Sequence, residues 1–159
     1  MANLALQLPL LALLIAAIPL TVIDIREHRL PNRITYSTIA ISLVGTAWSS
    51  ALSSDWERFA IATGLNLGIT AVGVLLYLVS GFGLGDVKLL IALNQILGYF
   101  SPWLVLISLT IALVSSSAFS LGGMMLGRLK WKDRIAFGPF LILGYAVLAA
   151  PLLVAPTLY

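Results

Sequence analysis

The sequence predicts an all-α membrane protein with six transmembrane helices and both termini on the outer side of the membrane. Hydrophobic residues make up 60% of the 159 positions and charged residues only 9%, whereas roughly a quarter of an ordinary soluble domain is charged. The charged residues are also clustered, which leaves five long runs that contain no charged side chain. These runs are 1–23, 34–54, 59–85, 89–127 and 135–159.

Four of these runs suit one transmembrane helix each, because about 20 apolar residues cross the hydrocarbon core of a bilayer. The run 89–127 is too long for one span, since at roughly 1.5 Å per residue it would form a helix of about 58 Å. Pro102 divides it, because proline lacks the backbone N–H that a continuing helix needs. The fourth span is then short, and it either sits low in the membrane or begins inside a covered cavity. The expected spans are about 3–23, 33–50, 58–80, 86–98, 102–126 and 136–155, within a single domain 1–159.

The basic residues predict how the chain is oriented. Only Arg58 falls in a loop on one side, and the other eight of the nine fall in loops on the opposite side: Arg26, Arg29, Arg33, Lys88, Arg128, Lys130, Lys132 and Arg134. Cytoplasmic loops carry an excess of Lys and Arg, so the first, third and fifth loops are expected in the cytoplasm. Because topology explains the net charge of +3, no nucleic-acid partner is indicated.

The residue types exclude several chemistries. The chain has no Cys and one His. A disulfide, a thiolate nucleophile and a zinc site built from cysteines are therefore excluded, and one His cannot build a multi-histidine metal centre. Neither a metal nor a cofactor is expected.

Two of the six acidic residues differ from the rest. Asp24 and Asp86 lie at the cytoplasmic ends of long apolar runs, where a carboxylate is costly unless it faces water, a partner or the interior of a helix bundle. Both are therefore candidates for function. The alternative is structural: Asp86 would cap the fourth helix, and Asp24 would pair with Arg26 or Arg29. Glu27 is interpreted as a surface acid.

The residues around the two aspartates carry further signals. Three glycines alternate within 81–85, directly before Asp86, and so many would destabilise a continuous helix. They are expected to let another group approach the backbone closely or to adopt positive φ. In the first loop, Pro31 is expected to end the extended segment and Asn32 to cap the second helix.

Three landmarks, in order, resemble the type IV prepilin peptidases, which are intramembrane aspartyl proteases with a G-x-G-D motif. They are Asp24 followed by Leu30-Pro31-Asn32, then Gly83-Leu84-Gly85-Asp86-Val87-Lys88-Leu89-Leu90, then Ala136-Phe137-Gly138-Pro139-Phe140. The resemblance implies that Asp24 and Asp86 are the catalytic pair. It also implies a prepilin or pseudopilin substrate whose basic leader is removed, typically after a Gly, at the cytoplasmic face of a prokaryotic inner membrane.

Seven further residues are expected to bind the substrate or to shape the site. Gly138 and Pro139 are expected to form a bend near the site, and Lys88 is expected to extend toward the membrane interface rather than to take part in catalysis. The full set is Pro31, Asn32, Gly83, Gly85, Lys88, Gly138 and Pro139.

One departure from the family pattern concerns methylation. Many members carry an additional cytoplasmic region with zinc-binding cysteines and a methyltransferase activity, and this chain has no Cys. The peptidase-only form is therefore expected. The sequence does not indicate the oligomeric state.

The chemistry of two aspartates supports the peptidase interpretation independently. Hydrolysis of an amide needs one group to take a proton from water and another to polarise the carbonyl, and two carboxyl groups that share a proton supply both. The alternatives are a small cation- or proton-coupled transporter that uses Asp24 and Asp86, and a membrane scaffold in which both acids are only caps. Both acids lie at one face and no internal repeat is evident, which favours the peptidase over the transporter.

Overall fold

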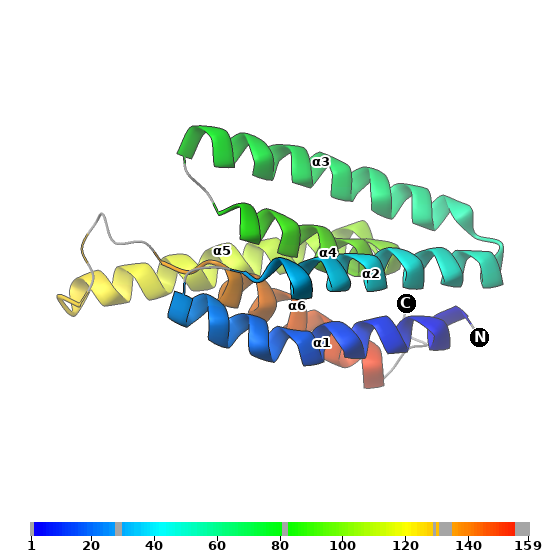
Figure 1. The fold of residues 1–159 in the computed structure, drawn as a ribbon, viewed down its shortest axis with the longest axis horizontal. Helices are drawn as coiled ribbons and strands as arrows, with labels where there is room; N and C mark the ends of the chain where they lie inside the picture. Colours follow the sequence, from blue (N-terminus) through cyan, green and yellow to red (C-terminus); the bar gives the residue numbers. More distant parts are fainter. Residues whose placement is uncertain (1, 28–29, 81–82, 129, 131–134, 155–159) are drawn as a thin grey trace.

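The computed structural model describes residues 2–27, 30–80, 83–128, 130 and 135–154, and these form an all-helical bundle without a strand. Six helices follow one another along the chain, and Figure 1 shows their arrangement. They are α1 (Ala2–Glu27), α2 (Asn32–Ser53), α3 (Trp56–Ser80), α4 (Leu84–Phe100), α5 (Pro102–Met125) and α6 (Gly138–Val154). The all-α prediction is therefore confirmed.

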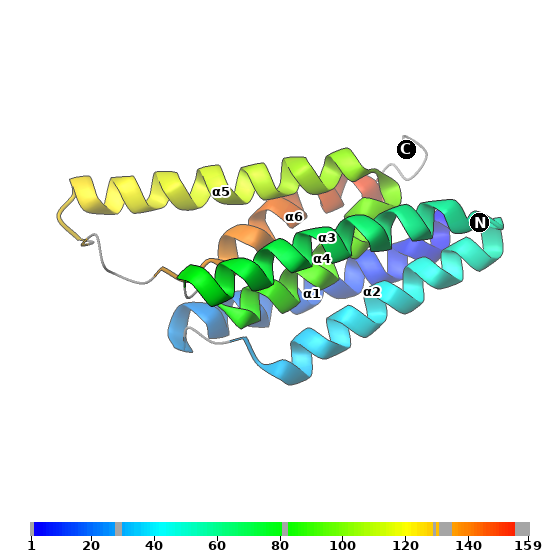
Figure 2. The ribbon, with the colours of Figure 1, turned by 90° about the horizontal axis from the view of Figure 1, so that it is seen from above.

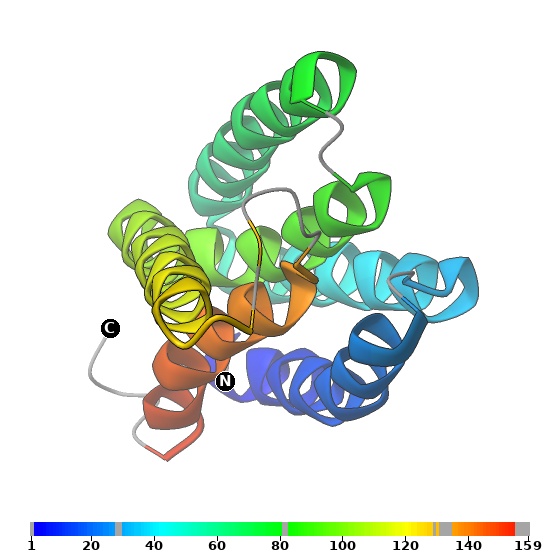
Figure 3. The ribbon, with the colours of Figure 1, turned by 90° about the vertical axis from the view of Figure 1, so that its left-hand side faces the viewer.

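Consecutive helices run in alternate directions, so the start of α1 and the end of α6 lie at the same end of the bundle (Figures 1 and 2). The opposite end contains the ends of α1, α3 and α5 and the starts of α2, α4 and α6. Figure 3 views the bundle from this second end. The central helix is α4, which packs against all five other helices. The first turn of α4 is thus held from several sides.

The predicted division of the long uncharged run is confirmed. The helix α4 ends at Phe100, and α5 begins at Pro102. Ser101 lies between them as the N-cap of α5, and its hydroxyl accepts a hydrogen bond from the Trp103 N–H at 3.3 Å. With 17 residues, α4 is about 26 Å long at 1.5 Å per residue, as short as expected.

Two local predictions are wrong. Pro31, not Asn32, is the N-cap of α2, and its carbonyl accepts hydrogen bonds from the N–H groups of Ile34 and Thr35, both at 3.1 Å. A proline can occupy this N-cap because the position contributes only its carbonyl oxygen and an extended backbone conformation. Asn32 is therefore the first helical residue.

The predicted bend at Gly138 and Pro139 is also absent. These residues are instead the first two of α6, and the Phe137 carbonyl accepts from Phe140 N–H at 3.0 Å and Leu141 N–H at 3.2 Å. A proline is tolerated in a first helical turn because its missing N–H would have no partner there.

Three described helices are long and apolar enough to cross a membrane, in the segments Leu6–Glu27, Trp56–Val79 and Pro102–Met125. The helix α6 is apolar but shorter. Large apolar side chains such as Leu8, Val79 and Met125 point outward and are more than 70% exposed, which water would not favour over so large a surface. The chain is a multi-pass membrane protein.

The helix α2 is built with its polar face inward. Spacings of three and four residues place six Ser and Thr side chains on one buried face: Thr35, Thr38, Ser42, Thr46, Ser49 and Ser50. Hydroxyls on this face donate to carbonyls of their own helix, for example Thr38 Oγ1 to Thr35 at 2.8 Å, a common solution in membrane helices. Large apolar side chains of α2, such as Val44 and Trp48, are exposed instead.

A buried glutamine of α4 forms hydrogen bonds with both α2 and α3. Gln95 Nε2 donates to Thr46 Oγ1 on α2 and to Thr63 Oγ1 on α3, both at 3.2 Å. Asn66 Nδ2 on α3 donates to Gln95 Oε1 at 3.1 Å and to the Ile91 carbonyl at 2.9 Å. Hydrogen bonds between membrane helices are a recognised means of association, and these fix α2, α3 and α4 together.

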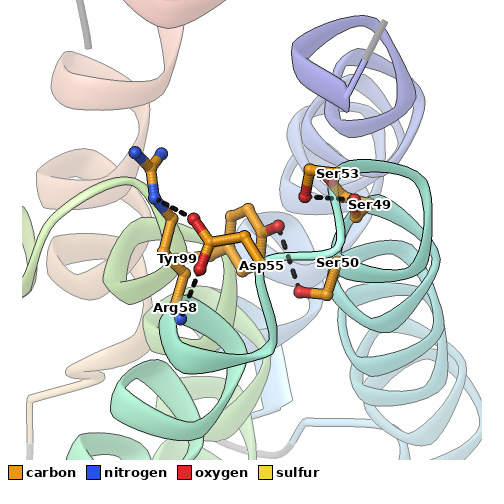
Figure 4. A network of polar contacts seen from close by, with 6 residues as sticks. All are labelled: Ser49, Ser50, Ser53, Asp55, Arg58 and Tyr99. Carbon is orange, nitrogen blue, oxygen red and sulfur yellow. Dashed lines mark hydrogen bonds and ion pairs between the residues drawn. The ribbon is translucent and has the colours of Figure 1, made fainter.

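A second contact between α2 and α4 lies near the end of the bundle that contains the start of α1 (Figure 4). The hydroxyl of Ser50 donates to the Tyr99 hydroxyl oxygen at 3.1 Å. In the same region, Asp55 forms an ion pair of 2.9 Å with Arg58 across the start of α3. Both contacts are far from the start of α4.

Close packing of α5 on α6 gives a stability prediction. A Cβ atom on Gly144 would overlap the backbone carbonyl oxygen of Ser108, and a helical carbonyl cannot turn away. We expect Gly144→Ala to lower the free energy of unfolding by about 1–3 kcal/mol, the usual cost of overpacking. Thermal unfolding in detergent measures the effect. Gly68→Ala is the control, because nothing lies within 4 Å of that position, and equal melting temperatures for the two variants would contradict the prediction.

Candidate active site

Asp24 occupies a core position of α1. The buried side chains of this helix repeat every three or four residues and are Leu6, Leu10, Leu13, Ala17 and Leu20. Asp24 is the next residue in this series, four positions after Leu20, so its carboxyl group continues the buried face. Its side chain is only 5% exposed. The fold therefore places a carboxyl group where a leucine would ordinarily pack.

Asp86 lies in the first turn of α4 and is half-buried. The N-cap of this helix is Gly83, and the Val87 N–H donates to the Gly83 carbonyl at 3.3 Å. A carboxylate is favoured in a first turn, where the helix dipole is positive. The alternative in which Asp86 caps this helix is wrong, because Gly83 is the N-cap and no side chain makes a capping hydrogen bond.

The glycines before Asp86 are needed for close approach. Gly83 has φ of −68°, so it does not use the positive φ that only glycine adopts readily. A Cβ atom on Gly83 would lie 2.8 Å from Asp86 Oδ2, and one on Gly85 would lie 3.0 Å from Leu30 Cβ. Gly83 therefore leaves room for the Asp86 carboxyl group, and Gly85 for the first loop.

The two carboxyl groups converge beside the first residue of α6. A Cβ atom on Gly138 would lie 2.5 Å from Asp24 Oδ2 and 3.5 Å from Asp86 Oδ1. One oxygen of each carboxyl group is thus close to the same point. Helices α1, α4 and α6 meet here, and the absence of a side chain at position 138 leaves space for both acids.

A cavity of about 460 Å³ opens beside the pair. Seven of the nine predicted site residues line it: Asp24, Pro31, Asn32, Gly83, Gly85, Asp86 and Lys88. Gly138 contacts the pair from α6, and Pro139 follows it in the first turn of that helix. The structure thus brings together residues from the first loop, α1, α4 and α6.

Three further residues, Glu27, Leu30 and Tyr36, lie at or beside the site. Two of them could have been found from their helical spacing to predicted site residues. Glu27 is exposed, as expected for a surface acid, but it also lines the cavity, and its spacing of three from Asp24 puts both on one helix face. Leu30 packs against Gly85. Tyr36 lies four residues after Asn32 and hence on the same face of α2.

Lys88 is directed toward α2. Its Nζ atom donates to Asn32 Oδ1 at 2.8 Å and lies 4.8 Å from the centroid of the Tyr36 ring. The ammonium group thus joins α4 to α2, and the predicted extension toward the membrane interface stays a prediction.

The arrangement has the components for acid–base chemistry. Two carboxyl groups so close together do not both ionise readily, because like charges at short range repel, and such pairs share a proton. Within the part of the chain that the structure describes, no group of three or more His, Cys, Asp or Glu side chains could hold a metal ion. Proton transfer is a reaction that two such carboxyl groups can carry out.

Comparison with known proteins identifies a family for this chain. The model of the type IV leader peptidase family matches residues 11–125, a range that contains both aspartates. Two curated proteins named prepilin leader peptidase/N-methyltransferase, from Burkholderia pseudomallei strains 1026b and K96243, are each 30% identical over 142 residues. The alignment covers 82% of this chain and 42% of each relative, so the chain spans less than half of their length. No solved structure matches the chain significantly. The chain belongs to the type IV leader peptidase family.

Proposed function

We propose that this protein is an intramembrane aspartyl endopeptidase that removes the basic leader of type IV prepilin or pseudopilin precursors, with Asp24 and Asp86 as its catalytic pair. The observation that carries the proposal is the convergence of the two carboxyl groups, one oxygen of each within 3.5 Å of the same point beside Gly138. Membership of the peptidase family supplies the reaction class.

The proposed mechanism uses the pair as a unit. One carboxylate takes a proton from a water molecule, and the oxygen of that water attacks the carbonyl carbon of the scissile peptide bond. The protonated partner donates a hydrogen bond to the carbonyl oxygen, and the pair then delivers a proton to the leaving nitrogen. Because the two groups titrate together, neither role is assigned to a single aspartate.

The surrounding residues have proposed roles in shaping the site. Small residues at positions 83, 85 and 138 keep the approach to the pair open, so that an extended substrate backbone can lie beside it. Pro31, Asn32 and Lys88 form the facing part of the cavity lining. Pro139 directly follows Gly138 as the second residue of α6, and its fixed φ suits the first helical turn that carries Gly138.

We also propose that all six helices span the prokaryotic cytoplasmic (inner) membrane, with both termini outside and the pair at the cytoplasmic face. Six helices that alternate in direction (Figure 1) would, if each crosses the membrane, leave both termini on the same side, which supports this topology. Described basic residues at the end of the bundle that contains the pair are Arg26, Arg33, Lys88, Arg128 and Lys130, against Arg58 at the other end. An excess of this kind is characteristic of the cytoplasmic side.

The proposal is limited to leader removal. The names of the relatives also include an N-methyltransferase, and the expectation of a peptidase-only form stays a prediction. A transporter that uses the same two acids would place them near the membrane midplane, whereas Asp24 lies in the last turn of α1 and Asp86 in the first turn of α4.

Co-expression with a prepilin tests the proposed function. We expect the wild-type chain to convert the precursor to a shorter product, and mass spectrometry of its amino terminus to locate the cut at the end of the leader. A well-expressed, membrane-inserted chain that leaves several prepilins and pseudopilins intact would contradict the proposal.

The proposed orientation has its own test. The chain lacks Cys, so single cysteines report without background when a membrane-impermeant thiol reagent is applied to intact cells. We expect Glu57→Cys to be labelled from the outside and Arg128→Cys only after the membrane is permeabilised. The reverse pattern would place the aspartates on the outer side and contradict the cytoplasmic assignment.

A further inference from the structure

The Lys88 cation connects α2 and α4, two of the helices beside the cavity. Lys88 lies in the second turn of α4, and Asn32 and Tyr36 lie one turn apart at the start of α2. The ammonium group donates to the Asn32 amide oxygen at 2.8 Å and lies 4.8 Å from the Tyr36 ring centroid, within the range of a cation–π interaction. Holding a flexible lysine side chain between two groups costs conformational entropy, which these two contacts offset.

This connection lies at the part of the α2–α4 interface nearest to the aspartates. Two other hydrogen bonds between these helices, Gln95 to Thr46 and Ser50 to Tyr99, lie further along α4. The buried hydroxyls of α2 mostly donate within their own helix. Lys88 makes a polar connection between α2 and α4 at the cavity end of their interface.

The position of α2 bears directly on the aspartates. Helices α1 and α4, which carry them, touch each other only slightly, whereas each packs extensively against α2. On the α6 side, the residue between the carboxyl groups is Gly138, which has no side chain to hold them. Helix α6 also packs against both α1 and α4, so the way the start of α2 is fixed to the start of α4 is one of the contacts that set the spacing of the two carboxyl groups.

We propose that Lys88 is a positioning residue, which holds the start of α2 against α4 through Asn32 and Tyr36 and so keeps Asp86 at its working distance from Asp24. The inference rests on the proposed peptidase function for its kinetic consequence but not for its structural one. It assigns the lysine an action through α2 rather than a contact with the substrate. A misplacement of about 1 Å in a catalytic group can lower a rate about 100-fold, so the connection has a measurable consequence.

A double-mutant cycle on the full chain tests the kinetic consequence. We expect Lys88→Met and Asn32→Ala each to lower kcat for prepilin cleavage by about tenfold or more, with KM changed less than about twofold. The double variant should be no slower than the slower single variant, because both changes break the same contact. Lys88→Arg should recover most of kcat, since it keeps the charge and the donors.

The ring contact is tested in the same assay. Tyr36→Phe keeps the aromatic face and should retain kcat, whereas Tyr36→Leu should lower it. Arg33→Met is the matched control, because it removes the cation next to Asn32, and that guanidinium has no hydrogen bond or ion pair among the described residues. Equal losses in Arg33→Met and Lys88→Met would show that charge alone matters and would overturn the proposal.

Hydrogen exchange measures the structural consequence without any substrate. We expect faster amide exchange in Lys88→Met and Asn32→Ala than in wild type at the first turns of α2 and α4, with α5 unchanged. Additive losses of kcat in the double variant, a rise in KM alone, or unchanged exchange would each overturn the positioning role. If the wild-type chain cleaves no prepilin, the proposed function fails, and the exchange measurement still decides whether Lys88 fixes α2 to α4.

Discussion

Asp24→Asn and Asp86→Asn are each expected to lower the rate of prepilin cleavage by about 10³-fold or more, while the protein still inserts and folds. The amide has nearly the shape of the carboxyl group but cannot take or give the proton, and acid–base catalysis of this kind contributes about 10²–10⁴-fold to a rate. Purified variants in detergent, assayed with a prepilin at fixed pH, give the comparison.

The matched control is Asp55→Asn. Asp55 forms an ion pair with Arg58 in an exposed turn (Figure 4), and surface ion pairs contribute little to stability, so cleavage should stay at the wild-type rate. The melting temperature of each variant identifies any loss of fold. Robust cleavage by either folded variant, Asp24→Asn or Asp86→Asn, would exclude the proposed catalytic pair.

Gly138→Ala should have the next largest effect. The new methyl carbon would lie 2.5 Å from Asp24 Oδ2 and 3.2 Å from its Cγ, so the buried carboxyl group must move away from its present position beside Asp86. We expect kcat to fall about 100-fold, as for a catalytic group displaced by about 1 Å. Helix stability should not fall in parallel, because Ala is a better helix former than Gly.

Activity and melting temperature measured on the same preparation separate these two effects. Gly122→Ala is the matched control, because nothing lies within 4 Å of a Cβ at that position. A folded Gly138→Ala variant with wild-type kcat would mean that the carboxyl groups need no such space. The role given to α6 in the site would then be wrong.

The sequence by itself determined the elements and their order. Clustered charges and the proline at 102 predicted six helices near their observed places. This was possible because an apolar run and a missing backbone N–H affect the structure of the same stretch of chain in which they occur. Asp24 and Asp86 could be identified as functional candidates for a similar reason. A carboxylate at the end of an apolar run is costly wherever that run packs, so its position in the sequence is enough to single it out. Family resemblance then supplied a reaction for them.

Only the tertiary structure decided what each of these residues contacts. The expected capping by Asn32 was wrong because Asn32 is the first residue of α2, and its amide oxygen accepts from Lys88, 56 residues away. The need for glycine at 138 could not be derived from its neighbours in sequence, because the atoms that a side chain would meet belong to α1 and α4. Helix propensity and hydropathy depend on residues a few positions apart, whereas the distance between two carboxyl groups depends on the packing of whole helices. That packing places one oxygen of each acid close to a single point beside α6.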